Sequence, residues 1–282
     1  SLASGGTPVS LRLIGWSPDS SRSLVTRSQA GQTSYWLVGS GVTTLDGLLP
    51  ADASQIQFDP SDSRRLYFVR AGSLFRLNTA DRTISSPILS EVVSYRASGG
   101  VINAIRTRGD SLALWHSDSS GSRLERVKDN LPSGDYALAY APETDTVAMA
   151  GPTQVEIYAP NGGRHRISRV IPGAFTSLDW NTNGQRLVYW RGDNVGTFDA
   201  QAAATYTAGT QAGLRAVSWT SDGDHLIISG QDGLTSFTEF DGAYPLTFKA
   251  LREGTLAYLV DLHELIYLDG DGKLYRVDLR RT

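Results

Sequence analysis

The chain has 282 residues, a formal net charge of −3 and no cysteine. The absence of cysteine excludes disulfides, thiolate metal sites and cysteine nucleophiles, and the slightly acidic balance provides no basic field for nucleic acid or anionic membranes. No apolar run approaches the roughly 18 residues that span a bilayer, and residues 1–10 lack the charged start and apolar core of a signal peptide. We therefore expect no membrane insertion in this segment, and composition leaves the compartment open.

A short cue, an aliphatic residue followed two positions later by an aromatic residue, recurs seven times. At this composition, seven arbitrary positions would hold only about 0.6 aromatic residues, so the choice of register does not explain the cue. Period-two spacing puts both side chains on one face of a strand. The aromatic residues recur every 37 to 45 residues, a repeat length typical of four-stranded propeller blades. The pairs are Ile14/Trp16, Ile56/Phe58, Val93/Tyr95, Leu138/Tyr140, Leu178/Trp180, Val217/Trp219 and Leu256/Tyr258.

Each copy continues with a mostly polar turn and a second strand, which predicts the order of strands within a blade. In the first blade we predict strands at 11–16, 23–27, 34–38 and 42–45, after the small and polar residues 1–10. Glycine-containing hairpins then lead to third strands at 74–77, 112–115, 155–158, 195–198, 234–237 and 274–277. The aliphatic residues of the second strands are Leu24, Leu66, Ile102, Val147, Leu187, Leu226 and Leu265.

These patterns predict an all-β, seven-bladed β-propeller of four-stranded antiparallel blades, in a single domain over residues 1–282. Only four residues follow the third strand of the last blade, so we expect the N-terminal segment to supply its fourth strand and close the ring. The alternatives are a weakly latched ring and a chain cut from a longer protein. The approximate blades are 11–50, 51–90, 91–133, 134–172, 173–211, 212–251, and 252–282 together with 1–10.

The stretch WSPDSSRSLV from Trp16 resembles the WSPDG-type repeat of TolB-like propellers, the bacterial relatives of WD-repeat domains. DWNTNGQRLVYW and SWTSDGDHLIIS are looser copies, and Ser20 stands where the repeat usually has glycine. The resemblance covers all seven units and is specific in three. It implies a propeller fold and an extracytoplasmic binding or scaffolding role, and it transfers no catalytic residue.

No group of residues in the sequence points to catalysis, a metal or a cofactor. The four histidines lie in different blades without paired metal-ligand spacing, and we expect them at surface or turn positions. A Gly-Asp-Ser-Leu string at 109–112 and Arg-Gly-Asp strings at 108–110 and 191–193 fall at predicted hairpins, where Gly-Asp is ordinary turn chemistry. Asp269 and Asp271 lack the remaining ligands of a calcium loop and predict a charged turn.

Arginines mark one rim of the predicted propeller. Arg27, Arg70, Arg108 and Arg191 each end a second strand, which places them beside the connections between blades. Those connections add Asp135 and Arg252. Such a rim could hold an acidic protein segment or a carboxylate ligand through forked hydrogen bonds, and the alternative is a set of solvated hairpin ends.

The sequence therefore favours a non-catalytic, monomeric propeller that binds a protein or peptide partner, or a small acidic ligand, on the face of the inter-blade loops. We expect no nucleic-acid partner. The alternatives are a propeller enzyme, the substrate-gating propeller of a larger hydrolase, and a structural module of a larger envelope protein.

Overall fold

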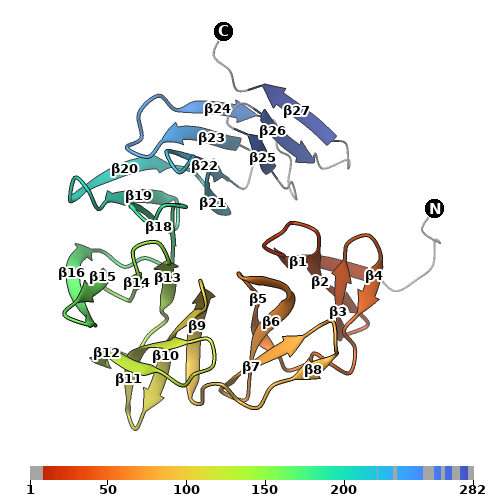
Figure 1. Ribbon diagram of the computed structural model, residues 1–282. Helices are drawn as coiled ribbons and strands as arrows, with labels where there is room; N and C mark the ends of the chain where they lie inside the picture. Colours follow the sequence, from red (N-terminus) through yellow and green to blue (C-terminus); the bar gives the residue numbers. More distant parts are fainter. Residues whose placement is uncertain are drawn as a thin grey trace. The chain divides into compact units, whose positions relative to one another are not determined.

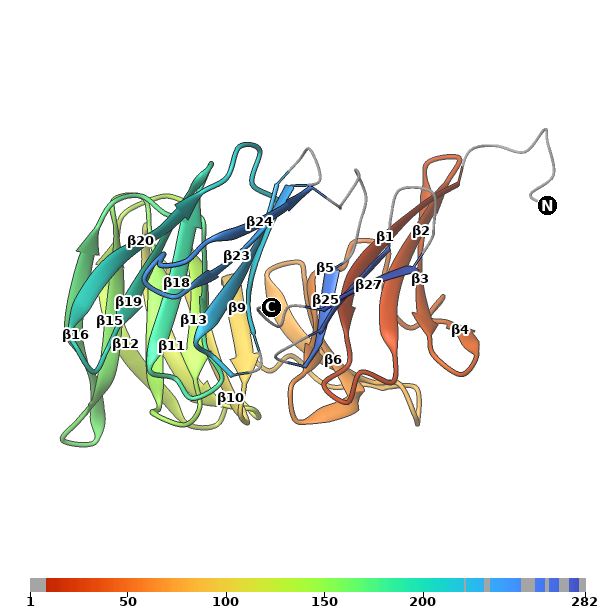
Figure 2. The ribbon, with the colours of Figure 1, turned by 90° about the horizontal axis from the view of Figure 1, so that it is seen from above.

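The computed structural model describes residues 9–220, 222–230, 234–249, 257–261, 264–268 and 274–278, and every regular element in them is a β-strand (Figures 1 and 2). The chain divides into two compact units, an N-terminal unit of residues 1–133 and a C-terminal unit of residues 134–282. A single domain over residues 1–282 stays a prediction.

The N-terminal unit contains three four-stranded antiparallel sheets, in the orders β1-β2-β3-β4, β5-β6-β7-β8 and β9-β10-β11-β12. The short strand β4 lies on the side of its sheet away from β5 (Figures 1 and 2). The strands are β1 (Val9–Trp16), β2 (Ser23–Gln29), β3 (Gln32–Val38), β4 (Val42–Thr44), β5 (Ser54–Asp59), β6 (Asp62–Arg70), β7 (Ser73–Asn78), β8 (Thr83–Ile84), β9 (Val92–Ser98), β10 (Val101–Arg108), β11 (Ser111–Asp118) and β12 (Leu124–Leu131).

The described residues of the C-terminal unit form three four-stranded sheets and one three-stranded sheet, again with sequence neighbours paired antiparallel. The strands are β13 (Ala137–Ala141), β14 (Thr146–Ala150), β15 (Gln154–Asn161), β16 (Arg164–Pro172), β17 (Ser177–Trp180), β18 (Arg186–Arg191), β19 (Asn194–Asp199), β20 (Ala204–Thr210), β21 (Ala216–Trp219), β22 (His225–Ser229), β23 (Leu234–Glu239), β24 (Leu246–Lys249), β25 (Ala257–Asp261), β26 (Glu264–Leu268) and β27 (Leu274–Asp278).

The all-β propeller fold is confirmed, but the prediction of seven four-stranded blades is wrong. The described residues form six four-stranded blades, and the seventh sheet, β25–β27, has three strands. Val9 and Ser10, which we expected to belong to the closing segment, instead extend β1 by pairing with Gln29 and Ser28 of β2. Their backbone groups are therefore used in the first blade, and residues 1–8 lie outside the described residues.

The aromatic residue of the cue falls on the first strand of every described sheet, as predicted, although its burial is uneven. Leu256, the aliphatic residue of the seventh cue, lies outside the described residues. First strands of consecutive blades contact each other where β5 meets β1 and β9, and where β13 meets β17. Phe58, Tyr95, Tyr140 and Trp180 are at most 9% exposed, whereas Trp16 is 55% exposed. Phe58, Tyr95 and Trp180 belong to apolar clusters that join two blades, so the prediction that these aromatics pack between blades is confirmed for these three and wrong for the exposed Trp16 in the described structure.

The second-strand aliphatic residues form the most uniform feature of the core. Leu24, Leu66, Ile102, Val147, Leu187 and Leu226 are all 0% exposed. Except for Val147, they belong to apolar clusters that each contain residues of two adjacent sheets, so each cluster joins two blades. Leu265 lies in β26, but its side chain is outside the described set. Runs of consecutive buried residues show that five second strands are buried on both faces, which explains their near-continuous apolar sequence: β6, β10, β14, β18 and β22.

The turn after three of the aromatics is built the same way and explains the WSPD-type repeat. A side-chain oxygen directly after the aromatic accepts a hydrogen bond from the backbone five residues later: Arg22 N to Ser17 Oγ (2.9 Å), Arg186 N to Asn181 Oδ1 (3.0 Å) and His225 N to Thr220 Oγ1 (3.2 Å). The Asp or Asn two residues further on accepts from the amide two positions after itself, at 3.0 Å in each copy. Side-chain oxygens at these two positions therefore satisfy the turn backbone in all three copies.

The first copy of this turn carries a residue that its backbone disfavours. Ser20 has φ 56°, where the other copies have Gly184 (φ 68°) and Gly223 (φ 72°). A left-handed conformation costs a residue with a Cβ about 1–2 kcal/mol, partly offset by the greater freedom of glycine in the unfolded chain. We therefore expect Ser20→Gly to raise the free energy of unfolding by about 0.5–1 kcal/mol in urea denaturation.

The matched control is Gly184→Ala, which we expect to lower the free energy of unfolding by about 1–3 kcal/mol. A Cβ on Gly184 would lie 2.8 Å from Ala141 Cβ and 3.1 Å from Thr144 Oγ1. Loss of stability in Ser20→Gly would contradict the account of this turn.

Candidate functional site

Each unit has two rims, formed by the two ends of its strands. The connection rim carries the hairpins between second and third strands and the connections to the next blade. The opposite ends, with the turns between first and second strands, are the turn rim. In the N-terminal unit the connection rim comprises residues 30–31, 46–53, 71–72, 85–91 and 109–110. Arg70 and Arg108 are the last residues of β6 and β10, and Arg27 lies two residues before the end of β2. The second strands of this unit therefore end at or near the arginines, as predicted.

Two adjoining hollows open on the connection rim of the N-terminal unit, with volumes of about 710 Å³ and about 390 Å³. They share Thr33, Asp46 and Ala51. Arg27 lines the larger hollow, with the β2–β3 hairpin, and Arg70 lines the smaller one, with Tyr35, Ile84 and residues 47–50 of the β4–β5 connection. Arg27 and Arg70, two of the predicted site residues, thus line one continuous depression.

Arg27 is held in place without a carboxylate. Its guanidinium lies 5.3 Å from the centre of the Trp36 ring and donates from Nη2 to Gln29 Oε1 at 2.5 Å. Trp36 is itself fixed by a hydrogen bond from Nε1 to Ser34 Oγ (2.9 Å). No acidic residue in the described part of the chain pairs with Arg27, so its remaining N–H groups are available for an anionic ligand.

Arg70 lies in an exposed ion pair at the mouth of the smaller hollow. Its Nε is 3.1 Å from Asp52 Oδ1, and the two side chains are 52% and 61% exposed. An exposed pair of this kind contributes little stability, so a ligand carboxylate can replace Asp52 at small cost. Tyr35 also lines the smaller hollow, and its hydroxyl donates a hydrogen bond to Ala53 O (3.1 Å). Burial and the negative charge of Asp52 both raise the pKa of Tyr35.

Arg108, the third predicted arginine of this unit, lines neither hollow. Arg108 pairs with Asp129 at 3.4 Å, and Asp129 also binds Arg126 at 3.0 Å. Arg191 and Asp135 belong to the C-terminal unit, where both are exposed. Arg252 lies outside the described residues. Trp36, Tyr35 and Asp46 were missed, although the Ala30–Gly31 hairpin aligns Val25 with Trp36 and so places Arg27 diagonally opposite that ring.

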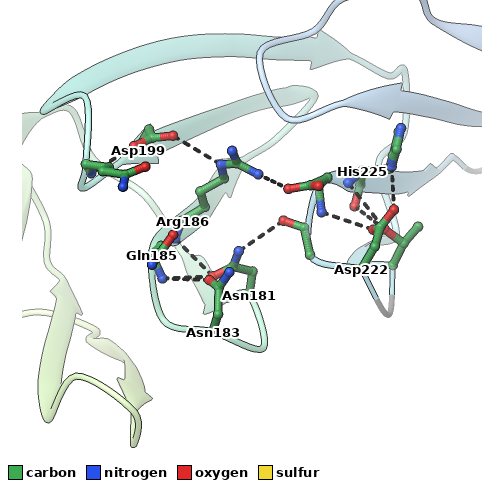
Figure 3. Close-up of polar contacts among 11 residues, drawn as sticks. Asn181, Asn183, Gln185, Arg186, Asp199, Asp222 and His225 are labelled. Carbon is green, nitrogen blue, oxygen red and sulfur yellow. Dashed lines mark hydrogen bonds and ion pairs between the residues drawn. The ribbon is translucent and has the colours of Figure 1, made fainter.

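The turn rim of the C-terminal unit carries a dense polar network that the sequence did not predict (Figure 3). Arg186 donates to Asp199 Oδ2 across its own blade (3.1 Å) and forms an ion pair with Asp224 of the next blade. Its guanidinium also lies 3.8 Å from the centre of the Phe240 ring. Asn181 Nδ2 adds a second link to the next blade by donating to Gly223 O (3.0 Å).

The charges of this network compensate one another. Burial alone would raise the pKa of Asp199, but hydrogen bonds from the Ala202 amide, Arg186 and the Gln201 amide outweigh it, so the pKa lies below its ordinary value. Because Arg186 has two acidic partners and an aromatic ring against it, little of its binding capacity is left for a ligand. We interpret this group as a clamp between blades rather than a binding site.

The histidines only partly follow the prediction of surface or turn positions. His225 is half-buried on the turn rim, with Nδ1 2.9 Å from Asp222 Oδ2 and its ring stacked on Phe237. His165 is 6% exposed, so the prediction is wrong for that residue. His116 is half-buried, with Nδ1 2.9 Å from Asn103 Oδ1, and His263 lies outside the described residues.

The Gly-Asp-Ser-Leu and Arg-Gly-Asp strings lie at hairpins, as predicted. Gly109 and Asp110 form the turn between β10 and β11, and Gly192 and Asp193 form the turn between β18 and β19. Each is a hairpin between two strands, and neither provides the strand-to-helix junction that a hydrolase nucleophile needs. Asp269 and Asp271 lie outside the described residues.

Comparison with solved structures identifies similar propellers. An oligogalacturonate lyase in complex with manganese is 15% identical, with a TM-score of 0.68 and coverage of 97% of this chain and 91% of that one. Apo AztD from Citrobacter koseri is 12% identical, with a TM-score of 0.67 and coverage of 95% and 82%. TolB from Acinetobacter baumannii is 12% identical, with a TM-score of 0.52 and coverage of 84% and 62%.

These likenesses establish the β-propeller fold. A TolB-like, WD-repeat-like propeller fits the structure, as the resemblance in the sequence implied. No protein-family model and no curated protein sequence matches the chain. The neighbours include an enzyme as well as other propellers, and identities of 12–15% carry no activity over to this chain. In the described part of the chain, no helix is long and apolar enough to cross a membrane.

Proposed function

We propose that this protein is a non-catalytic β-propeller that binds an acidic protein segment, or a smaller carboxylate ligand, on the connection rim of its N-terminal unit. The observation that carries the proposal is the pair of adjoining hollows lined by Arg27 and Arg70. Arg27 supplies a cation with no carboxylate partner in the described structure, oriented by Trp36. Arg70 supplies a second one whose exposed partner can be displaced.

The two hollows suit an extended segment better than a single small anion. Their shared residues make one depression continuous from the β2–β3 hairpin to the β4–β5 connection. Leu48, Leu49 and Pro50 add apolar contact surface beside Arg70. A segment carrying two acidic side chains could engage both arginines while its backbone lies along the connection. Charge-assisted hydrogen bonds of this type contribute about 1.5–3 kcal/mol each.

The test uses fluorescein-labelled hexaglutamate as the probe and hexaglutamine as its uncharged counterpart, with binding followed by fluorescence anisotropy at low salt. We expect wild-type protein to prefer hexaglutamate and the Arg27→Glu/Arg70→Glu double variant to bind it at least about tenfold more weakly. The matched control is Arg64→Glu, because Arg64 is an exposed arginine of the same unit that pairs with Asp62 on the turn rim. Equal loss in this control would show a general charge effect and contradict the proposed site.

The alternative is a propeller enzyme, which the structural likeness to an oligogalacturonate lyase brings into consideration. Oligogalacturonate is itself a chain of carboxylates and would suit arginines. Incubation with oligogalacturonate and Mn²⁺, followed by chromatography of the products, separates the two functions. Cleavage that exceeds a heat-denatured control favours the enzyme, and intact substrate that competes with hexaglutamate favours the binding module.

The remaining features of the proposal come from the sequence. An extracytoplasmic location rests on the resemblance to TolB-like propellers, and a monomeric state on the repeat pattern. Contributions of Arg108, Arg191, Asp135 and Arg252 to the same face stay predictions. They can be examined by charge reversal in the hexaglutamate assay.

A further inference from the structure

A third hollow, of about 260 Å³, lies within the C-terminal unit between the blades β13–β16 and β17–β20. It opens on the turn rim and so differs in place from the proposed binding surface. Its walls come from Ile157 of one blade and from Trp180 and Phe198 of the next, and each of these side chains is at most 7% exposed. This hollow is therefore an apolar slot between two packed sheets.

Small residues keep the hollow open on the side of the β19–β20 hairpin. Ala200 and Ala203 line it there, and Gly184 lines it from the neighbouring turn. The hairpin is held by the Asp199 carboxylate, which accepts hydrogen bonds from the Gln201 and Ala202 amides at 2.8 and 2.9 Å. Ala203 keeps a left-handed backbone, with φ 52°. The loop is thus tied in one conformation, and the slot is formed before any ligand arrives.

Arg169 is the one ionisable side chain among the residues that line this hollow. Its guanidinium lies 5.8 Å from the centre of the Phe198 ring, and no described acidic residue pairs with it. Two hydroxyl groups of the lining are already used, since Ser168 Oγ donates to Ile157 O (3.1 Å) and Thr146 Oγ1 to Thr144 O (3.2 Å). Thr144 and Gln185 are the other uncharged polar residues of the lining. The slot therefore offers apolar walls and a single positive charge.

We propose that this hollow is a second site, which binds a small monocarboxylate with an aromatic body. The aromatic body would lie against Ile157, Trp180 and Phe198, and the carboxylate would accept hydrogen bonds from the Arg169 guanidinium. The volume is at the small end of ligand pockets, which limits the ligand to about one ring with a short chain. The absence of any carboxylate in the lining selects an anion over a cation or a zwitterion.

The test measures binding of 3-phenylpropanoate by saturation-transfer NMR and titration calorimetry, with 3-phenylpropanamide as the neutral counterpart and 3-phenylpropylamine as the cation. We expect the acid to bind wild-type protein about tenfold more tightly than the amide, and the amine not to bind. Arg169→Gln should weaken the acid about tenfold and leave the amide unchanged. Ala200→Leu, at an exposed position that allows a larger side chain, should block both.

The matched control is Arg166→Gln on the same strand, because Arg166 is exposed and does not line the hollow. It should bind the acid like wild type, as should the Arg27→Glu/Arg70→Glu variant, so this site and the proposed function can fail independently. Equal affinities for acid and amide, undiminished binding in Ala200→Leu, or no detectable binding of the acid to wild-type protein would each overturn the proposal.

Discussion

Trp180→Ala is expected to lower the free energy of unfolding by about 3–5 kcal/mol. Trp180 is 7% exposed and belongs to the apolar cluster that joins the blades β13–β16 and β17–β20. It packs in that cluster with Leu178 and Leu187 of its own blade and with Val155 and Ile157 of the neighbour. Removing the indole leaves a cavity between two packed sheets, and their close packing limits collapse around it.

Urea denaturation followed by far-ultraviolet circular dichroism measures this effect without relying on the fluorescence of the removed ring. The conservative variant Trp180→Phe should lose about 1–2 kcal/mol, because phenylalanine refills most of the space. The Trp180 Nε1 group is buried and has no hydrogen-bond partner among the described residues, so its removal breaks no hydrogen bond. Wild-type stability in Trp180→Ala would contradict the assigned burial.

Arg186→Met is expected to lower the free energy of unfolding by about 2–3 kcal/mol. The substitution keeps most of the aliphatic length but removes the cation shared by Asp199 and Asp224. The Asp199 side chain is 9% exposed, so its carboxylate is left buried without its cation, whereas the 58% exposed Asp224 is readily solvated. Most of the loss therefore comes from Asp199.

The stability lost in Arg186→Met should depend on pH, because it depends on the charge of Asp199. The pKa of Asp199 lies below its ordinary value of 3.8, so the ionised carboxylate stabilises the fold above that value, and this stability is lost as the pH falls through the lower folded-state pKa. In Arg186→Met the pKa of Asp199 rises, because burial is no longer opposed by the guanidinium. The stability difference between wild type and variant should therefore be full near neutral pH and shrink below about pH 4.

The control for the clamp is Arg64→Met, which removes an exposed arginine paired with Asp62 at 3.2 Å. Exposed pairs contribute about 0–1 kcal/mol, so this variant should remain close to wild type in urea denaturation. If both variants lose the same stability, or if the Arg186→Met difference does not change with pH, then the clamp does not act through the Asp199 charge.

Much of each blade was predictable because its signals are local. The aliphatic-x-aromatic cue marked the first strands, and the apolar residues after the turns marked second strands whose members, such as Leu24 and Leu187, are 0% exposed. The predicted third strands at 112–115 and 195–198 lie inside β11 and β19. Period-two burial and turn chemistry act over fewer than ten residues, and a single sequence displays them directly.

The candidate sites were less predictable because they depend on neighbours. Arg27 and Arg70 were identified as rim residues, but the hollows also need Tyr35 and the β4–β5 connection, and the smaller hollow forms only when two blades pack. The number of strands in the seventh sheet was also missed. The cue counts first strands, and outer strands such as β8, which has two residues, leave almost no pattern in the sequence.

The sequence by itself determined the repeat, the strand order within each blade and the turn that Ser17, Asn181 and Thr220 build, because each depends on residues close together in the chain. Only the tertiary structure decided that Arg186 pairs with Asp224, 38 residues away, and that the Arg169 guanidinium lies over the Phe198 ring of the adjacent blade. Which side chains meet across blades depends on how two sheets pack, and the local alternation that specifies each strand carries no information about that packing.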